Sequence, residues 1–218
     1  MEFCDEIQYA VPGNGKQFNS TELAKKYDAY AKKMYESFEK VMMQIQCETT
    51  STQKYSLVRT CEDCAKAYKR WLCTVTMPRC EDIMSLNPHA IMRNIGQAFP
   101  NGTKLPDKMA AALSSNPALN KSRNKFIDTD IKPGPYKEIL PCDDVCYDVV
   151  QSCPAAIGFN CPRPKMTGFN TSYGVYDDDN NDLTCNFAGE ARTRISGGSV
   201  VSMSVVMAMV PMYLMLLI

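Results

Sequence analysis

Cysteine is the residue type whose number and spacing in this chain carry the clearest chemical meaning. Eleven cysteines occur among 218 residues, and most of them fall in two short clusters, residues 61–80 and 142–161. Cysteines at this density form disulfides, bind metal ions or act as nucleophiles. The complete set is Cys4, Cys47, Cys61, Cys64, Cys73, Cys80, Cys142, Cys146, Cys153, Cys161 and Cys185.

Metal binding and catalysis both fit this pattern poorly. Cys61 and Cys64 have CxxC spacing, but no strand precedes them as a thioredoxin-like motif requires. A zinc site needs further ligands at matching spacing, and the single histidine, His89, lies in a predicted loop without an activating context. We therefore predict no enzyme, no catalytic residue, no metal and no cofactor. Two cysteines three apart on a helix point the same way, so each is expected to bridge to another element.

An acidic run at residues 177–182 raises the possibility of calcium binding. An EF-hand loop starting at Asp177 would need glycine at 182 and glutamate at 188, but the chain has Asp182 and Ala188 there. We expect a solvated loop, with a weak cation-attracting patch as the alternative. Lys and Arg balance Asp and Glu at 24 each, so the chain lacks the basic surplus expected of a nucleic-acid partner.

Glycosylation signals place these cysteines on the oxidising side of a membrane. Disulfides persist in secreted proteins, and N-glycosylation of Asn-x-Ser/Thr occurs in the same compartment. The alternative is that these sequons are unmodified polar loops. The four acceptor residues are Asn19, Asn101, Asn120 and Asn170.

The first residues, MEFCDEIQYAVPGNG, contain no signal peptide. We therefore expect that upstream sequence precedes Met1. The odd cysteine count leaves one cysteine unpaired within the chain. A missing partner or a buried free thiol is favoured over an intermolecular bridge.

The C-terminal tail is apolar and uncharged after Arg194. Residues 200–218 approach the length of about 20 residues that a membrane span needs. Small residues, a spacer and an apolar end favour a signal for a GPI anchor. A transmembrane anchor is the second reading, and a buried helix is the third. The candidate attachment residues are Ser196, Gly197 and Gly189.

Three helices are expected to position the cysteines. Residues 19–47 have apolar side chains at spacings of three and four, with Asn19 or Ser20 as the cap. Thr60 caps a second helix at 61–73, and a third covers 142–153, with cysteines facing inward in both. Residues 84–138 read as a long polar loop excursion from the core. The domain is expected to span residues 1–187, followed by a linker at 188–199 and the tail at 200–218.

Two strings carry a resemblance to a known family: YSLVRTCEDCAKAYKRWLCTVTMPRC and PGPYKEILPCDDVCYDVVQSCPAAIGFNCP. With FCDEIQYAVPGN and LAKKYDAYAKKMYESFEKVMMQIQC, they resemble the C-terminal cysteine-rich region of the fungal mating-induced-death protein family. That family comprises regulatory subunits of a stretch-activated calcium channel. The resemblance covers residues 3–187. Members of that family have a long glycosylated N-terminal half that does not occur in this sequence.

The resemblance implies a fold and a role. The fold would be a mostly α, disulfide-rich, Frizzled-like cysteine-rich domain with long irregular loops and an apolar C-terminal tail. The domain would lie on the extracellular face of the plasma membrane, reached through the endoplasmic reticulum. There it would bind the pore-forming subunit of a calcium channel and support stretch- or stress-activated calcium influx. The alternative is a cell-surface Frizzled-like module that binds a lipid or peptide without a channel. The resemblance identifies no position of this sequence as a pore-lining residue.

Overall fold

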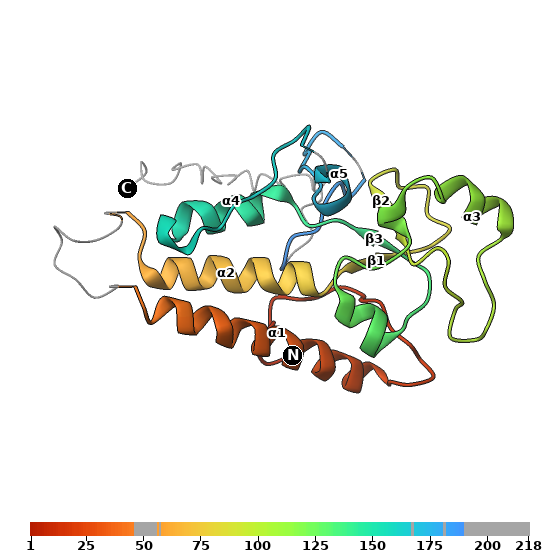
Figure 1. Cartoon of the computed structure of the whole chain (residues 1–218), viewed down its shortest axis with the longest axis horizontal. Helices are drawn as coiled ribbons and strands as arrows, with labels where there is room; N and C mark the ends of the chain where they lie inside the picture. Colours follow the sequence, from red (N-terminus) through yellow and green to blue (C-terminus); the bar gives the residue numbers. More distant parts are fainter. Residues whose placement is uncertain (46–55, 57, 167, 181, 190–218) are drawn as a thin grey trace, which may run out of the picture.

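Three long helices packed side by side form one end of the molecule. The computed structural model describes residues 1–45, 56, 58–166, 168–180 and 182–189. Helix α2 (Cys61–Thr76) lies between α1 (Ser20–Met42) and α4 (Asp143–Ser152) and packs against both (Figure 1). Chain segments far apart in the sequence therefore meet along α2.

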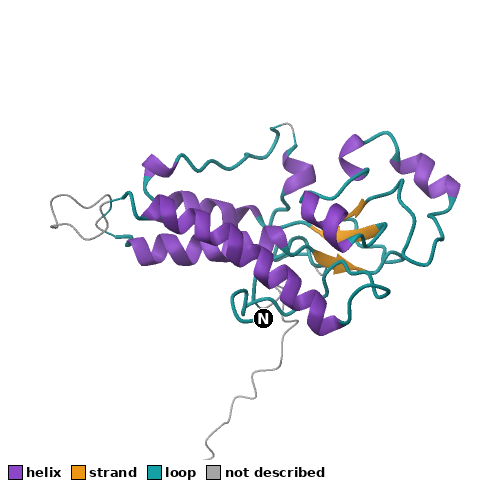
Figure 2. Ribbon diagram, turned by 60° about the horizontal axis from the view of Figure 1, so that its bottom comes forward, coloured by secondary structure: helices purple, strands orange, loops and turns teal. Residues whose placement is uncertain are grey.

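A small sheet with short helical segments forms the other end (Figure 2). The strands are β1 (Arg79–Glu81), β2 (Ala90–Arg93) and β3 (Tyr136–Ile139), in the antiparallel order β1-β3-β2. Around them lie α3 (Asp107–Leu113), α5 (Phe169–Ser172), the 3₁₀ turn Pro117–Leu119 and the π-helical turn Ile127–Ile131. The 3₁₀ turn Ala155–Ile157 follows α4 at the helical end, where Ile157 packs against the cluster that contains Phe38 and Cys64.

Reciprocal side-chain caps start the two longest helices where the sequence predicted. The Asn19 side chain accepts from the Glu22 N–H at 2.9 Å, and the Glu22 carboxylate accepts from the Asn19 N–H at 3.0 Å. Thr60 and Asp63 form the same capping box at α2. Each arrangement provides acceptors for two backbone N–H groups that otherwise have no hydrogen-bond partner at the start of a helix. The predicted helices at these positions are confirmed, although α1 ends at Met42 and Cys47 lies outside the described residues.

Helix α1 buries a narrower face than its apolar pattern predicted. Tyr27, Ala31 and Phe38 are buried, whereas Met34 and Val41 of the predicted stripe are exposed. The difference arises because α2 covers only part of the stripe. Phe38 stacks on Tyr68 of α2 with ring centroids 3.7 Å apart, and this contact fixes the face that α1 presents.

The segment 84–138 differs from the predicted loop excursion. It contains β2, α3, two helical turns and the start of β3. Four of its apolar side chains form a core cluster of their own, and these are Met92, Ile95, Leu105 and Leu119. The strands are only three or four residues long, too short for an alternating apolar pattern to stand out in the sequence.

The described residues contain no helix that is both long and apolar enough to span a membrane. The predicted tail at 200–218 lies outside these residues.

Candidate functional site

Disulfides connect each cysteine cluster to other elements. Cys64 of α2 pairs with Cys153 at the end of α4, and Cys4 ties the N-terminal segment to α2. Cys61 is also disulfide-bonded, so the CxxC cysteines do not pair with each other in this structure. The four pairs seen among the described residues are Cys4–Cys73, Cys64–Cys153, Cys142–Cys185 and Cys146–Cys161.

The N-terminal segment is held against α1 by one carboxylate. Asp28 accepts hydrogen bonds from the backbone N–H groups of Glu2, Phe3 and Cys4 at 2.8–3.0 Å. Burial alone would raise the pKa of Asp28, but these three donors favour the charged form and hold its pKa below the ordinary value. Asp28 therefore anchors the segment that carries the Cys4–Cys73 bridge.

Cys80 is the free cysteine of the described part of the chain. It lies in β1 opposite Glu138 of β3. Burial raises the pKa of the Cys80 thiol to about 12, and the negative charge of Glu138 acts in the same direction. A reactive cysteine instead has a lowered pKa, because the thiolate is the nucleophile. Cys80 therefore lacks the environment that lowers the pKa of a thiol and activates it as a nucleophile.

We expect Cys80 to resist alkylation in the native protein. At pH 8.5 an ordinary thiol is about half ionised, whereas a thiol of pKa about 12 is ionised roughly a thousandfold less. Iodoacetamide labelling followed by peptide mapping should show the Cys80 peptide unmodified in the native state. The same peptide should be labelled in guanidinium without reductant. Fast native labelling would contradict this assignment.

A buried ion cluster fixes the centre of the sheet. Glu138 of β3 is fully buried and accepts from Arg93 Nε at 2.7 Å and from Arg123 Nε at 3.0 Å. Arg93 also donates to the carbonyls of Ala118 and Thr171, so it joins β2 to a 3₁₀ turn and to α5. Burial alone would lower the pKa of Arg123, but Glu138 raises it above the ordinary value.

These three charged residues were missed by sequence reasoning. They lie in or beside a segment that looks polar and solvated, and charge normally indicates a surface position. The strand Tyr136–Ile139 is too short to reveal the burial of Glu138 by an alternating pattern. No local sequence pattern links Glu138 to either arginine.

Two loops lie against each other beyond the sheet, residues 81–89 and 174–180, called here the paired loops. Asn87 Nδ2 donates to the carbonyl of Leu183 at 3.1 Å, just beyond the second loop. The ring Nε2 of His89 lies 3.1 Å from Nδ2 of Asn180. His89 is therefore engaged with an amide and shows no arrangement with a nucleophile.

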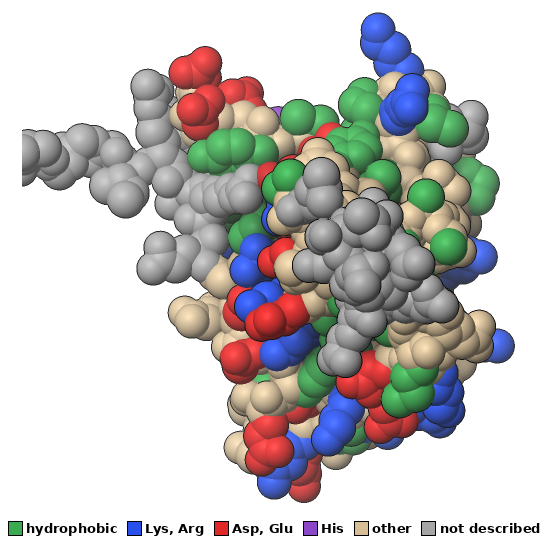
Figure 3. All heavy atoms as spheres, turned by 90° about the vertical axis from the view of Figure 1, so that its left-hand side faces the viewer, with side chains coloured by type: hydrophobic (Ala, Val, Ile, Leu, Met, Phe, Trp, Pro, Cys, Tyr) green, Lys and Arg blue, Asp and Glu red, His purple; other side chains and the backbone are tan. Residues whose placement is uncertain are grey.

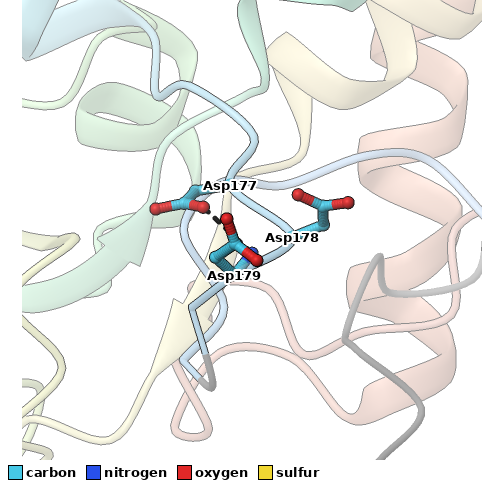
Figure 4. A group of neighbouring side chains, drawn as sticks. All are labelled: Asp177, Asp178 and Asp179. Carbon is cyan, nitrogen blue, oxygen red and sulfur yellow. Dashed lines mark hydrogen bonds between the residues drawn. The ribbon is translucent and has the colours of Figure 1, made fainter.

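Three neighbouring aspartates supply all of the charge of the second loop. Asp177, Asp178 and Asp179 are exposed, and one carboxylate oxygen of each lies within 4.8 Å of the others. Figure 4 shows Asp177 and Asp178 on opposite sides of Asp179, whose N–H donates to Asp177 at 3.0 Å. The exposure of these aspartates agrees with the predicted solvated loop, and the weak cation-attracting patch stays an alternative prediction.

The sequon asparagines are all exposed. Asn101 lies in a turn and Asn120 follows a 3₁₀ turn, but Asn170 lies within α5 and not in the predicted loop. Asn19 has its side-chain oxygen occupied as the cap of α1. Among the lipidation candidates, Gly189 donates its N–H to the Glu6 carbonyl at 2.8 Å, whereas Ser196 and Gly197 lie outside the described residues.

An open apolar groove of about 440 Å³ runs between α1 and α2 at the helical end. Aromatic and methionine side chains dominate its walls, together with Glu39 and Cys61. The apolar lining consists of Tyr35, Phe38, Met42, Met43 and Ala65.

Comparisons with known proteins agree on one family. The family model for the stretch-activated Ca²⁺-permeable channel component (Mid1) matches residues 1–191. "Stretch-activated cation channel yam8" of Schizosaccharomyces pombe is 37% identical over 189 residues, covering 87% of this chain and 34% of that protein. "Stretch-activated cation channel MID1" of Saccharomyces cerevisiae is 34% identical over 195 residues, covering 88% of this chain and 31% of that protein.

The chain therefore spans about a third of the length of these curated relatives. No solved structure gives a significant match. The Frizzled-like likeness thus stays a prediction, whereas the disulfide-rich character and the helices are observed directly.

Proposed function

Because this chain belongs to the family of stretch-activated Ca²⁺-permeable channel components, we propose that it is a regulatory subunit of a plasma-membrane calcium channel. In this role it binds the pore-forming subunit and supports stretch- or stress-activated calcium influx without catalysing a reaction. The observation that carries the proposal is the family match over residues 1–191, which includes every described residue.

The covalent framework supports an extracellular position for this subunit. Disulfides of this number persist in oxidising compartments. The proposal includes a Frizzled-like domain at residues 1–187 and glycans on the four exposed sequon asparagines. It also includes a linker at 188–199 and a tail at 200–218 that serves as a GPI signal or a membrane anchor.

Co-purification with a channel tests this proposal. The full chain should be tagged, expressed in its native organism and purified after detergent extraction. A large multi-span channel protein should then co-purify with it. Deleting its gene should lower calcium uptake after hypo-osmotic shock, and the wild-type gene should restore it. Unchanged uptake in the deletion, together with no retained channel, would exclude the role.

A second candidate rests on the apolar groove between α1 and α2. Its aromatic and methionine lining has the chemistry of a site for a lipid chain or an apolar peptide. Under this alternative the protein is a cell-surface module with no channel partner. Native mass spectrometry separates the two, because a bound lipid or peptide without a co-purifying channel favours the module.

A further inference from the structure

We propose that the paired loops, residues 81–89 and 174–180, form the docking surface for a basic protein segment that also carries apolar side chains. The inference rests on the proposed function, since the segment would belong to the channel subunit that this chain binds. Docking is placed on these two loops, and the partner's segment is expected to be basic and partly apolar.

The paired loops are held in place before any partner arrives. Gly174 is fixed from both sides, because its N–H donates to the Pro141 carbonyl at 2.8 Å and its carbonyl accepts from the Asp143 N–H at 2.9 Å. The Asp177 N–H donates to Thr184 Oγ1 at 3.2 Å, which closes the second loop. Lys137 Nζ donates to the Ser85 carbonyl at 2.7 Å, which holds the first. A surface fixed in this way loses little conformational freedom on binding.

Large apolar side chains project from both loops. Leu86 is 95% exposed, Met84 is 77% exposed and Val175 is 51% exposed. Single exposed apolar residues are ordinary on protein surfaces. Here two of the most exposed apolar residues of the described chain lie two positions apart on one short loop. They provide candidate anchors for the buried centre of an interface.

The negative charge of this surface indicates a basic partner. The paired loops contain five acidic residues and no Lys or Arg: Glu81, Asp82, Asp177, Asp178 and Asp179. Because the chain is neutral overall, the rest of it carries a surplus of five positive charges. Figure 3 shows acidic side chains gathered at the upper left, beside the chain's single histidine. Lys137 adds one positive charge beside Ser85, but the patch is mainly acidic. A mainly acidic patch attracts a basic segment and repels acidic surfaces, including anionic lipid.

Neither loop contains a sequon asparagine, so no N-linked glycan is attached to the surface itself. The nearest sequon asparagine along the sequence is Asn170 in α5, four residues before the second loop. The charge and the exposed apolar side chains of the loops fit a protein segment with Lys or Arg beside apolar residues.

The test uses the full chain in its own cell and measures the amount of channel retained on the tagged protein. One variant combines Met84→Ser with Leu86→Ser, and a second combines Asp177→Asn, Asp178→Asn and Asp179→Asn. The matched controls are Val58→Ser, since Val58 is 85% exposed at the helical end, and Glu36→Gln, which changes an exposed α1 carboxylate. Surface level and thermal midpoint are measured for every variant, so that misfolding is detected.

We expect the first variant to lower channel retention at least tenfold with an unchanged thermal midpoint, because loss of an anchor typically weakens binding by that factor or more. The aspartate variant should also lower channel retention, and its retention should change less with salt concentration than that of the wild type. Both controls should bind like wild type. Wild-type retention in both loop variants would overturn the docking surface while leaving the proposed function standing.

Failure of the wild-type chain to retain any channel would reject the proposed function, and the docking surface with it. Binding of wild-type protein to zwitterionic lipid vesicles, lost in the first variant, would assign the loops to a membrane and overturn the protein partner.

Discussion

Replacing Glu138 with alanine is expected to lower the free energy of unfolding by about 3–5 kcal/mol. The substitution leaves Arg93 and Arg123 without their shared carboxylate, and Arg93 is buried together with Glu138. A buried charge without a partner is costly because water cannot reach it. Urea denaturation with the disulfides intact measures the change.

Controls separate the lost charge from the lost volume. Glu138→Gln keeps the size and one acceptor oxygen, so it should cost less than alanine but more than a surface change. Glu36→Ala on the exposed face of α1 should change stability by no more than about 0.5 kcal/mol. Adding Arg123→Met to Glu138→Ala should recover part of the loss, since one buried charge is then removed. A Glu138→Ala value equal to that of Glu36→Ala would show that the ion cluster adds nothing.

Removing the Cys64–Cys153 bridge with serine at both positions is expected to lower stability by about 4.5 kcal/mol. The bridge closes a loop with a sequence separation of 89, and the entropy that a crosslink removes from the unfolded chain grows with loop length. We also expect the amount of this protein at the cell surface to fall, because the variant misfolds. Calcium uptake should fall with it. Denaturant unfolding and the amount of surface protein measure these effects.

The Cys146–Cys161 bridge provides the matched comparison. Its sequence separation is 15, so replacing both cysteines by serine should cost about 3 kcal/mol. A larger loss for this short loop than for Cys64–Cys153 would contradict the entropic explanation. Normal uptake in both double variants would reject the idea of an essential crosslinked domain.

The sequence predicts the helices well because their signals are local. Asn19 and Thr60 stand at helix starts, and apolar spacing continues over many turns of α1. The apolar residues of α4 are less informative, since Val149 is buried whereas the neighbouring Val150 is 44% exposed. Which part of an apolar face becomes buried depends on the neighbouring element, and that information is not local.

The sheet and the ion cluster could not be predicted for the same reason. β1 and β2 pair with β3 across about 50 residues of sequence, and each is too short to show a period. Arg93 and Glu138 look like surface residues until the fold brings them together. The acidic run was recognised, but its neighbour, loop 81–89, was not, because only tertiary contacts such as Asn87 to Leu183 bring the two together.

The order of the disulfides has a mechanical consequence. The bridges from Cys4, Cys64 and Cys142 overlap along the sequence, so a covalent route from Cys4 to Cys185 follows only part of α2 and part of α4. That route contains about 20 residues of backbone and three disulfide crossings of 4.5–5.7 Å between Cα atoms, so it extends to at most about 85 Å, against about 600 Å for the unbridged chain. Tension applied to the two ends is carried by these two helix segments, while α1, the sheet and the paired loops lie outside the loaded path. A pull on the two ends would therefore be carried by a covalent link far shorter than the unbridged chain.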